Sequence, residues 1–317
     1  MNENTRLADS SSDRSTVASV IVIGAVTVSM LFLPSLGGDY VVGVVFTLLM
    51  WLALTESWIV LSGLTGYISL GHAVFFGAGS YVLVLAWPAF PLWVAIPLAG
   101  IAGGVIALLV GYPCLRVRGP YFVILTFGLA EFIKYSVVIM ESFLGQHSRI
   151  LFAAPTVKDL FPVMVVLAAA ATLMVLFVRQ SRFGMGLRAI RENEGAAETL
   201  GVAVARFKVI AFALSAAIPA MVGAVMVLRT TYFEPLQVFN PLTSFTIVVI
   251  AVIGGSDDVP GPLWGALFLV LLQELLWTKV PQAYLIILGV LLIACVIWAP
   301  DGIHGRMRRL FQKRSPR

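Results

Sequence analysis

The chain of 317 residues contains little charge: Asp, Glu, Lys and Arg make up 12% of it, whereas hydrophobic residues make up 60%. A soluble protein of this length cannot hide so much apolar surface, because roughly half of its surface faces water. The apolar residues occur in successive blocks of about 17–22, the length that crosses a bilayer core of about 30 Å. The composition therefore predicts a polytopic helical membrane protein, and the absence of ten-residue segments with alternating polarity argues against a β-barrel.

Groups that carry catalysis or bind metals are also scarce. The two cysteines, Cys114 and Cys295, lie far apart in or beside apolar segments, which predicts packing residues and no disulfide or metal framework. The three histidines (His72, His147 and His304) have no metal-ligand spacing. No phosphate-binding GxxxxGK[ST] loop and no GxSxG motif is present. We therefore expect no enzyme activity, no metal and no cofactor, so any energy from ATP has to come from a partner subunit.

The distribution of basic residues predicts the topology. The apolar blocks are 17–33, 41–61, 68–87, 91–111, 120–140, 161–178, 207–228, 242–254, 262–277 and 281–299. If they cross alternately from an inside N-terminus, inside segments hold 16 of the 21 Lys and Arg residues and outside segments hold four, with Lys134 inside a span. By the positive-inside rule both termini are then cytoplasmic, and the net charge of +5 reflects topology and not nucleic-acid binding. We expect a cytoplasmic tail over 1–16, retained without cleavage, a transmembrane domain over 17–305 and a basic cytoplasmic tail over 306–317.

Three regions do not fit straight spans. Glycine-rich, nearly uncharged breaks occur at 63–72 (GLTGYISLGH) and 253–262 (IGGSDDVPGP), as expected of discontinuous helices that line a transport path. Free N–H groups at the helix that follows the first break would attract a carboxylate, which suits a zwitterionic amino acid. Alternatively, the glycines only permit tight helix packing. The outside loop 141–160 is long enough to carry a short surface helix.

Glu56, Glu131, Lys134 and Glu274 are ionisable residues that lie inside the predicted spans. Each costs about 2.5–3.5 kcal/mol at the centre of a membrane helix, so each should face protein or water. Glu131 and Lys134 are three residues apart and can neutralise one another. Glu56 and Glu274 have no obvious local partner. A secondary transporter driven by protons or sodium through these carboxylates is therefore one alternative.

The longest charged interruption in the apolar chain is 179–208. Its middle has helical periodicity, between Gly184 and Gly186 at the start and Gly201 at the expected C′ position. One stripe is apolar (Leu187, Ile190, Ala197 and Leu200) and the opposite side is charged (Arg188, Arg191, Glu192 and Glu198). Arg188 and Glu192 are spaced for an ion pair. The pattern predicts a short amphipathic helix that either passes force to a soluble partner or is merely a surface loop helix.

Four motifs resemble a known family. They are GYISLGHAVFFGAGSY (66–81), RFGMGLRAIRENEGAAETLGVAVARFKVIAFALSAAIPAMVGA (182–224), VIGGSDDVPGPLWGAL (252–267) and APDGIHG (299–305). In order and content they resemble the LivM-type permease subunits of bacterial branched-chain amino acid ABC importers. The resemblance implies an all-α inner-membrane permease with about ten transmembrane or re-entrant segments, glycine-broken helices and a cytoplasmic coupling helix. It implies branched-chain or other hydrophobic amino acids as substrates, although related subunits carry urea or short amides.

The resemblance also implies partners and sites. The partners are a second homologous permease subunit, two cytoplasmic ATP-binding subunits, a periplasmic substrate-binding protein and the lipid bilayer. The implied substrate pathway comprises Gly66, Tyr67, Ser69, Gly71, His72, Gly254 and Gly255. The implied coupling residues are Gly184, Leu187, Arg188, Ile190, Arg191, Glu192, Glu194, Ala197 and Gly201, with the apolar stripe in a groove of the ATPase and the charged residues setting orientation. Ile59, Tyr67, Pro219 and the two acidic residues of 256–258 depart from the family pattern, and Pro219 could kink its span.

Overall fold

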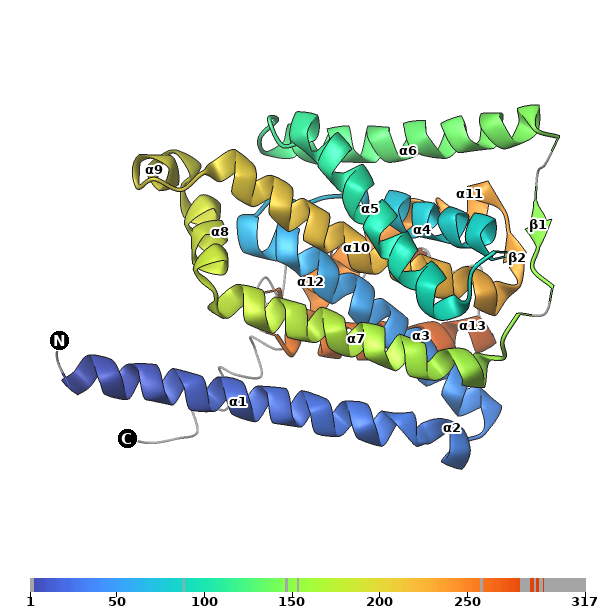
Figure 1. Cartoon of the computed structure of the whole chain (residues 1–317), viewed down its shortest axis with the longest axis horizontal. Coiled ribbons are helices and arrows are strands. Elements are labelled where there is room, and N and C mark those ends of the chain that lie inside the picture. The colour runs from blue at the N-terminus through green and yellow to red at the C-terminus, as the bar shows by residue number, and fades with distance from the viewer. Residues whose placement is uncertain are drawn as a thin grey trace.

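The computed structural model describes residues 3–87, 89–145, 148–152, 154–256 and 259–279, together with 286–287, 289–290 and 293. This part of the chain is almost entirely helical, so the predicted all-α class is confirmed (Figure 1). The elements are α1 (Glu3–Leu31), α2 (Leu33–Leu36), α3 (Asp39–Trp58), the π-helical turn η1 (Ile59–Gly63), α4 (His72–Ala86), α5 (Leu92–Cys114), α6 (Pro120–Phe143), β1 (Arg149–Ile150), α7 (Val157–Gln180), α8 (Arg182–Glu192), α9 (Glu194–Thr199), α10 (Val204–Thr230), β2 (Tyr232–Phe233), α11 (Pro235–Val238), α12 (Leu242–Gly254) and α13 (Gly261–Lys279).

Seven helical segments of the described residues are long and apolar enough to cross a membrane, and α4 and α13 contain shorter apolar helices. The predicted blocks 91–111 and 120–140 correspond to α5 and α6. The count of about ten is not confirmed, and most of the block 281–299 lies outside the described residues. Within the apolar block 68–87 the helix begins at His72, which agrees with the predicted break over 63–72.

The helix α10 runs through the centre of the bundle and packs against α3, α4 and α5. Its contact with α4 depends on small residues: a side chain on Gly79 would overlap the carbonyl oxygen of Ala220, and one on Gly223 would overlap that of Phe76. Ser80 Oγ also donates to the carbonyl of Gly223 at 2.8 Å. Because small residues let two backbones approach closely, the second half of α4 is fixed against α10.

Two kinds of residue within the helices are predicted from the sequence, namely a proline that could kink its span and cysteines that pack in apolar surroundings. Pro219 lies inside α10, which continues from Val204 to Thr230 on both sides of it. Cys114 is buried at the end of α5 in an apolar cluster with Leu115 and Phe122, in agreement with a packing role. Cys295 lies outside the described residues.

A short antiparallel ladder lies at one end of the bundle, which we call the β1–β2 end (Figure 1). Arg149 pairs with Phe233 and Ile150 pairs with Tyr232. The loop 141–160 therefore contributes a strand where a short surface helix was considered. The ladder ties the start of α7 to the end of α10, while His147 lies outside the described residues.

The helices α8 and α9 lie at the opposite end, the α8–α9 end (Figure 1). The helix α1 runs along α7, and its N-terminus is at the α8–α9 end. This helix begins at Glu3 and so extends through most of the segment 1–16, which is predicted to be a tail. The apolar segment long enough to cross a membrane, Val17–Leu36, consists of the second half of α1 and the short helix α2.

Candidate functional site

The chain leaves helical geometry between α3 and α4. After the buried turn η1, Gly66 takes a φ of +76°, which is a left-handed conformation that glycine adopts readily. The chain stays non-helical until His72 begins α4. We call residues 66–71 the unwound segment. Five predicted pathway residues lie on it or directly after it, namely Gly66, Tyr67, Ser69, Gly71 and His72, and π-helical turns such as η1 are common at functional sites.

The backbone of the unwound segment needs partners other than helix hydrogen bonds. The N–H of Ser69 donates to Ser62 Oγ at 3.2 Å, and Trp58 Nε1 donates to the carbonyl of Ser69 at 2.9 Å. The N–H of Leu70 donates to Thr126 Oγ1 at 3.2 Å. Side chains from α3, η1 and α6 therefore hold this backbone in place.

The first turns of α4 and α12 meet beside the unwound segment. The N–H of Ala73 donates to Ser244 Oγ at 2.8 Å, and the N–H of Gly71 donates to Ser69 Oγ at 3.2 Å. The His72 side chain is fully buried, and neither ring nitrogen has a hydrogen-bond partner among the described residues. The start of α4 thus combines an N-terminal helix end, which favours anionic groups, with a buried imidazole that can still donate or accept.

Sequence reasoning missed Ser62, Thr126 and Ser244 as partners of this break. Each is a hydroxyl in or beside an apolar block, and such hydroxyls commonly bond to a carbonyl of their own helix. Thr126 does so as well, since its hydroxyl also contacts the carbonyl of Val123 at 3.0 Å. The sequence contains only a weak indication of these contacts, namely that a hydroxyl inside an apolar block can form a hydrogen bond to another helix of the membrane bundle.

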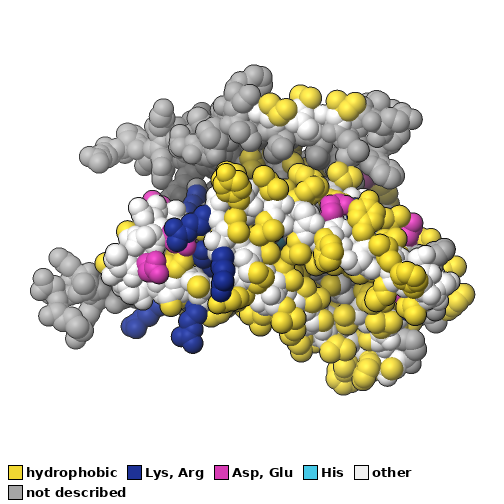
Figure 2. Space-filling model, turned by 90° about the horizontal axis from the view of Figure 1, so that it is seen from above, with side chains coloured by type: hydrophobic (Ala, Val, Ile, Leu, Met, Phe, Trp, Pro, Cys, Tyr) yellow, Lys and Arg dark blue, Asp and Glu magenta, His cyan; other side chains and the backbone are white. Residues whose placement is uncertain are grey.

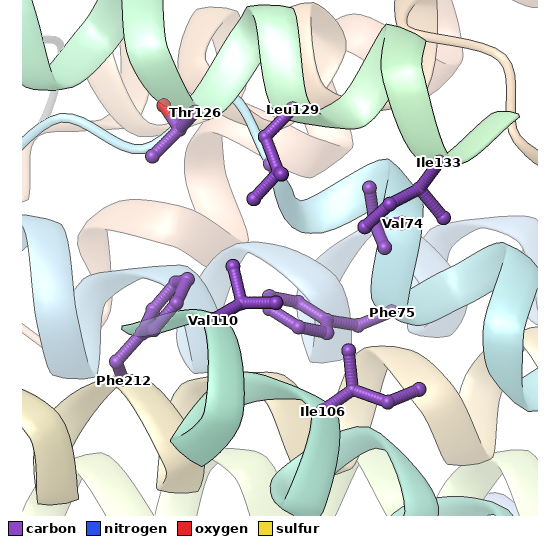
Figure 3. A pocket seen from close by; sticks show the side chains of 9 residues that line it. Val74, Phe75, Ile106, Val110, Thr126, Leu129, Ile133 and Phe212 are labelled. Atoms are coloured by element: carbon purple, nitrogen blue, oxygen red, sulfur yellow. The ribbon is translucent and has the colours of Figure 1, made fainter. Parts of the chain in front are cut away.

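An apolar pocket opens beside Gly71, between α4, α5, α6 and α10 (Figure 3). Its lining consists of Gly71, Val74, Phe75, Ile106, Val110, Thr126, Leu129, Ile133 and Phe212. In Figure 3 the side chains of Thr126 and Leu129 extend from α6 toward the space bounded by Phe75 and Val110. Aliphatic and aromatic groups therefore dominate the pocket, and the Thr126 hydroxyl lies next to the unwound segment.

The second glycine break is not brought together with the first. Gly254 ends α12 and Gly255 has a φ of +93°. A side chain on Gly254 would overlap the carbonyl oxygen of Gly261, and one on Gly265 would overlap that of Ile250. These glycines thus allow α12 and α13 to cross closely. A pathway role for Gly254 and Gly255 stays a prediction, and the acidic pair 257–258 lies outside the described residues.

The predicted amphipathic helix is two helices, α8 and α9, separated by the extended residue Asn193. Leu187, Ile190 and Ala197 are at most 3% exposed because they pack against their own chain. Leu200, predicted on the same stripe, is 81% exposed. For Leu187, Ile190 and Ala197 the expectation of a partner groove is therefore wrong, because these side chains pack against the bundle, and Leu200 alone of the stripe is exposed. The role of the two helices in coupling stays a prediction.

The glycines of this region have separate structural roles. Gly184 lies against the carbonyl oxygen of Val178, and Gly186 lies against the ring of Phe207, so neither site has room for a side chain. Gly201 follows α9 with a φ of +85°, and its N–H donates to the carbonyl of Glu198. The predicted stop at Gly201 is confirmed.

The charged residues of α8 differ in what they contact. Arg188 donates to the carbonyl of Arg179 at 3.1 Å, and the described residues contain no ion pair between Arg188 and Glu192, so that expectation is wrong. Glu192 is exposed. Arg191 Nη1 donates to the carbonyl of Gly63 at 2.9 Å. Arg191 therefore connects α8 to η1 and faces the bundle, although it was expected to orient a partner.

Glu194 also faces the bundle, where it accepts hydrogen bonds from two residues. The Tyr67 hydroxyl donates to Glu194 Oε2 at 2.5 Å, and Lys208 Nζ donates to Glu194 Oε1 at 2.9 Å. Lys208 Nζ also donates to the carbonyl of Leu115 at 3.0 Å and lies 3.1 Å from the Tyr67 hydroxyl. Arg118 Nη2 is 3.3 Å from Glu194 Oε1. We call Tyr67, Arg118, Glu194 and Lys208 the α9 cluster.

The α9 cluster favours the ionised form of its carboxyl group. Burial alone would raise the pKa of Glu194, but the hydrogen bonds from Tyr67 and Lys208 outweigh burial and hold the pKa below its ordinary value. Burial and the hydrogen bond to Glu194 raise the pKa of the Tyr67 hydroxyl well above its ordinary value. At neutral pH the cluster therefore contains a carboxylate, a neutral phenol and two cations.

A similar group lies at the other end of α4. The Tyr81 hydroxyl donates to Glu141 Oε1 at 2.7 Å, and Arg149 Nη2 donates to both oxygens of Glu141 at 2.8 and 3.0 Å. Glu141 is buried at the end of α6, and Arg149 belongs to β1. We call Tyr81, Glu141 and Arg149 the α6 cluster. It fixes the β1–β2 end to α4 and α6.

Basic side chains are divided between the two ends as the topology predicts. Figure 2 shows Lys and Arg gathered at the α8–α9 end, with hydrophobic side chains over much of the remaining visible face. Exposed cations of the connections at this end include Arg116, Arg118, Arg182, Arg188 and Arg206. Arg149 and Arg229 lie beside β1 and β2. Which end faces the cytoplasm stays a prediction.

The carboxylates at membrane depth have different surroundings. The Glu131–Lys134 ion pair is confirmed, with an N–O distance of 2.5 Å. Glu274 Oε1 accepts a hydrogen bond from the Tyr40 hydroxyl at 2.5 Å. Glu56 is 1% exposed, and among the described residues neither of its oxygens has a hydrogen-bond partner. Of the three carboxylates, Glu56 alone has no hydrogen-bond partner in the described part of the chain.

Comparison with known proteins gives one consistent result. The family "Branched-chain amino acid transport system / permease component" matches residues 40–296. The high-affinity branched-chain amino acid transport system permease protein LivM of Salmonella typhimurium is 26% identical to the chain over 290 residues. The aligned residues make up 81% of this chain and 68% of the relative. LivM of Escherichia coli is 26% identical over 278 residues, with 77% and 65% covered.

A second type of relative matches as well. The permease protein LivH of Escherichia coli is 26% identical over 276 residues, which is 77% of this chain and 87% of LivH. The chain spans about two thirds of the length of the LivM relatives. No solved structure matches the chain.

Proposed function

The chain belongs to the family of permease components of branched-chain amino acid transport systems, and on that premise we propose that it is a membrane-spanning permease subunit of an ABC importer. As a member of this family it is a transporter subunit and a multi-pass membrane protein. The proposed cargo is branched-chain or other hydrophobic amino acids. ATP is hydrolysed by partner subunits, because the sequence contains no phosphate-binding loop.

One observation carries this proposal beyond the family. The helices α8 and α9, proposed to receive the partner ATPases, contact the break in the membrane helix, because Arg191 donates to the carbonyl of Gly63 at 2.9 Å. A permease driven by soluble ATPases requires a mechanical path of this kind between its soluble face and its membrane interior. An ion-coupled transporter has no need of it.

The proposed substrate path passes the start of α4. The carboxylate of an amino acid is stabilised by the N-terminal end of this helix, beside His72 and Ser244. The apolar lining next to Gly71 would contact a branched aliphatic side chain, although the cavity of about 10 Å³ holds no more than a water and has to widen during transport. Urea and short amides lack such a side chain, so hydrophobic amino acids are the favoured substrates.

The proposed assembly contains a second homologous permease subunit, two cytoplasmic ATP-binding subunits and a periplasmic substrate-binding protein, in a bacterial inner membrane. The match to both LivM and LivH supports pairing of two related permeases. The α8–α9 end, with its exposed basic residues, is assigned to the cytoplasm together with the N-terminal tail 1–16 and the C-terminal tail 306–317. The transmembrane domain is 17–305, with the coupling region at 179–206.

Uptake by proteoliposomes that contain the whole assembly tests this function. We expect uptake of radiolabelled leucine to require ATP, to persist in the presence of a protonophore and to exceed that of urea. Arg191→Ala should lower leucine uptake by about tenfold, the cost of a hydrogen bond to a charged group. Arg182→Ala, which removes an exposed cation from the same helix, should leave it within twofold. Uptake that needs an ion gradient and not ATP would contradict the proposal.

A further inference from the structure

Two hydrogen bonds join α8–α9 to the break in the membrane helix. One runs from Arg191 to the carbonyl of Gly63, and the other runs from the Tyr67 hydroxyl to Glu194. The two hydrogen bonds end on parts of the chain with different backbone structure. Gly63 ends the helical turn η1, whereas Tyr67 lies within the unwound segment, where helix hydrogen bonds do not resist displacement.

Tyr67 is held on several sides, so a displacement of Glu194 acts on the whole residue. Its ring makes an edge-to-face contact with Phe122, with the ring centroids 5.3 Å apart. Lys208 Nζ lies 4.5 Å from the ring centroid, within the range of a cation–π interaction. Since the next residues of the unwound segment lead directly into α4, moving Tyr67 also moves the backbone that precedes His72.

The ion pair between Glu194 and Lys208 explains why the contact of α9 with Tyr67 would persist when α8–α9 is displaced. The Lys208 side chain is 4% exposed and that of Glu194 is 14% exposed, so this pair differs from a solvent-exposed ion pair of small value. Separating them would leave a buried ammonium group without its anion, which is costly. A movement of α9 and α10 that keeps Glu194 and Lys208 in contact therefore costs less free energy than one that separates them.

The helix α9 is bounded by residues at which the chain changes direction. Asn193 before it is extended, with φ −159° and ψ 109°, and Gly201 after it has a φ of +85°. Between them Ala197 is buried, whereas Gly195 and Glu198 are exposed. A partner that presses on the exposed face can therefore displace α9 as one short unit, with Glu194 on its inner side.

We propose that Tyr67, Glu194 and Lys208 form a latch that makes the unwound segment move with α8–α9, so that displacement of these helices repositions the start of α4. Glu194 and Tyr67 are then positioning residues of transport. The inference rests on the proposed function for its consequence, but the mechanical link itself does not depend on the cargo.

Hydrogen–deuterium exchange of the purified full-length chain in nanodiscs tests the link independently of transport. Tyr67→Phe removes one hydroxyl, and we expect exchange of the peptide covering 63–71 to rise at least threefold. Tyr81→Phe is the matched control, because it removes the same kind of hydrogen bond, to Glu141, at the other end of α4. Its exchange over 63–71 should be unchanged. Equal exchange in wild type and Tyr67→Phe would overturn the latch.

The consequence for transport is measured as leucine taken up per ATP hydrolysed by the whole assembly. We expect Tyr67→Phe to lower this ratio at least threefold while ATP hydrolysis stays within twofold, and Tyr81→Phe to preserve the ratio. Because Glu194→Gln alone can fail to fold, Glu194→Gln with Lys208→Met removes both charges together and should also lower the ratio. A ratio that stays at the wild-type value in both latch variants overturns the proposal.

The two measurements separate the two proposals. If the wild-type assembly transports no amino acid but exchange over 63–71 rises in Tyr67→Phe, the proposed function fails and the mechanical link stands. If leucine is transported but neither measurement distinguishes Tyr67→Phe from Tyr81→Phe, the function stands and the latch fails.

Discussion

The two ends of α4 carry similar chemistry in different mechanical settings. In both the α9 cluster and the α6 cluster a tyrosine hydroxyl donates to a glutamate that also contacts a basic residue; Glu141 is buried and Glu194 is partly buried. Tyr81 belongs to a regular helix whose backbone packs directly against α10. Tyr67 belongs to the unwound segment, and its glutamate lies on a short helix between the extended residue Asn193 and the turn at Gly201.

The same hydrogen bond can therefore have different consequences. Where the backbone on both sides is already fixed, as in the α6 cluster, a Tyr–Glu contact adds stability and little else. Where the backbone has few helix hydrogen bonds, as in the α9 cluster, the contact acts together with the hydrogen bonds of Trp58, Ser62 and Thr126 to set where the segment lies. The comparison predicts that changes in the α6 cluster alter stability, whereas changes in the α9 cluster alter stability and transport.

The largest expected effect is that of Glu194→Ala. It leaves Lys208 buried without its anion, so we expect a loss of about 3–5 kcal/mol in the free energy of unfolding. Replacing Lys208 by Met as well should recover most of this loss, because it removes the unpaired charge. Thermal unfolding in detergent measures both. A double variant as unstable as the single one would show that the charge is not the cause.

A smaller loss of stability is expected from Glu141→Gln in the α6 cluster. The change weakens the charge-assisted hydrogen bonds from Arg149, which costs about 1.5–3 kcal/mol. Unlike changes at Glu194, it should leave leucine uptake per ATP hydrolysed at the wild-type value. If uptake per ATP fell in parallel with stability, the two clusters would not differ as proposed.

Two glycines allow a matched comparison of backbone strain at the two ends. Gly201 follows α9 with a φ of +85°, Gly145 follows α6 with a φ of +67°, and neither has a neighbouring atom that an added methyl group would touch. Gly201→Ala and Gly145→Ala should each cost about 1–2 kcal/mol, because L residues disfavour this region. Only Gly201→Ala should also reduce uptake per ATP, as it changes a turn that bounds α9.

The smallest expected effect concerns pH. The pKa of Glu194 is held below its ordinary value near 4.5, so its ionised form stabilises the fold above that pH. The stabilisation is lost only as the pH falls through the lowered pKa. The difference in melting temperature between wild type and Glu194→Gln should thus be constant from pH 8 to about pH 5 and shrink below it. A difference that disappears between pH 8 and pH 6 would contradict this assignment.

The sequence predicted the apolar segments, the glycine breaks and the Glu131–Lys134 pair because these depend on local spacing. It did not predict that Leu187, Ile190 and Ala197 face the bundle, because an apolar stripe has the same spacing whether it packs against its own chain or against a partner. Nor did it place Glu194 beside Tyr67, because that contact depends on how α9, α10 and the unwound segment pack together. Tyr67 was noted as a departure from the family pattern, and the structure assigns its hydroxyl a specific partner.

The central claim, that the unwound segment moves with α9, is tested by distances between spin labels at exposed positions in the whole assembly. With Cys114 and Cys295 replaced by alanine, labels at Ile68 and Gly195 report on the latch, and labels at Ile68 and Ile150 report on movement relative to the β1–β2 end. We expect the first distance to stay constant when ATP is added, while the second changes. A first distance that changes as much as the second would contradict the account.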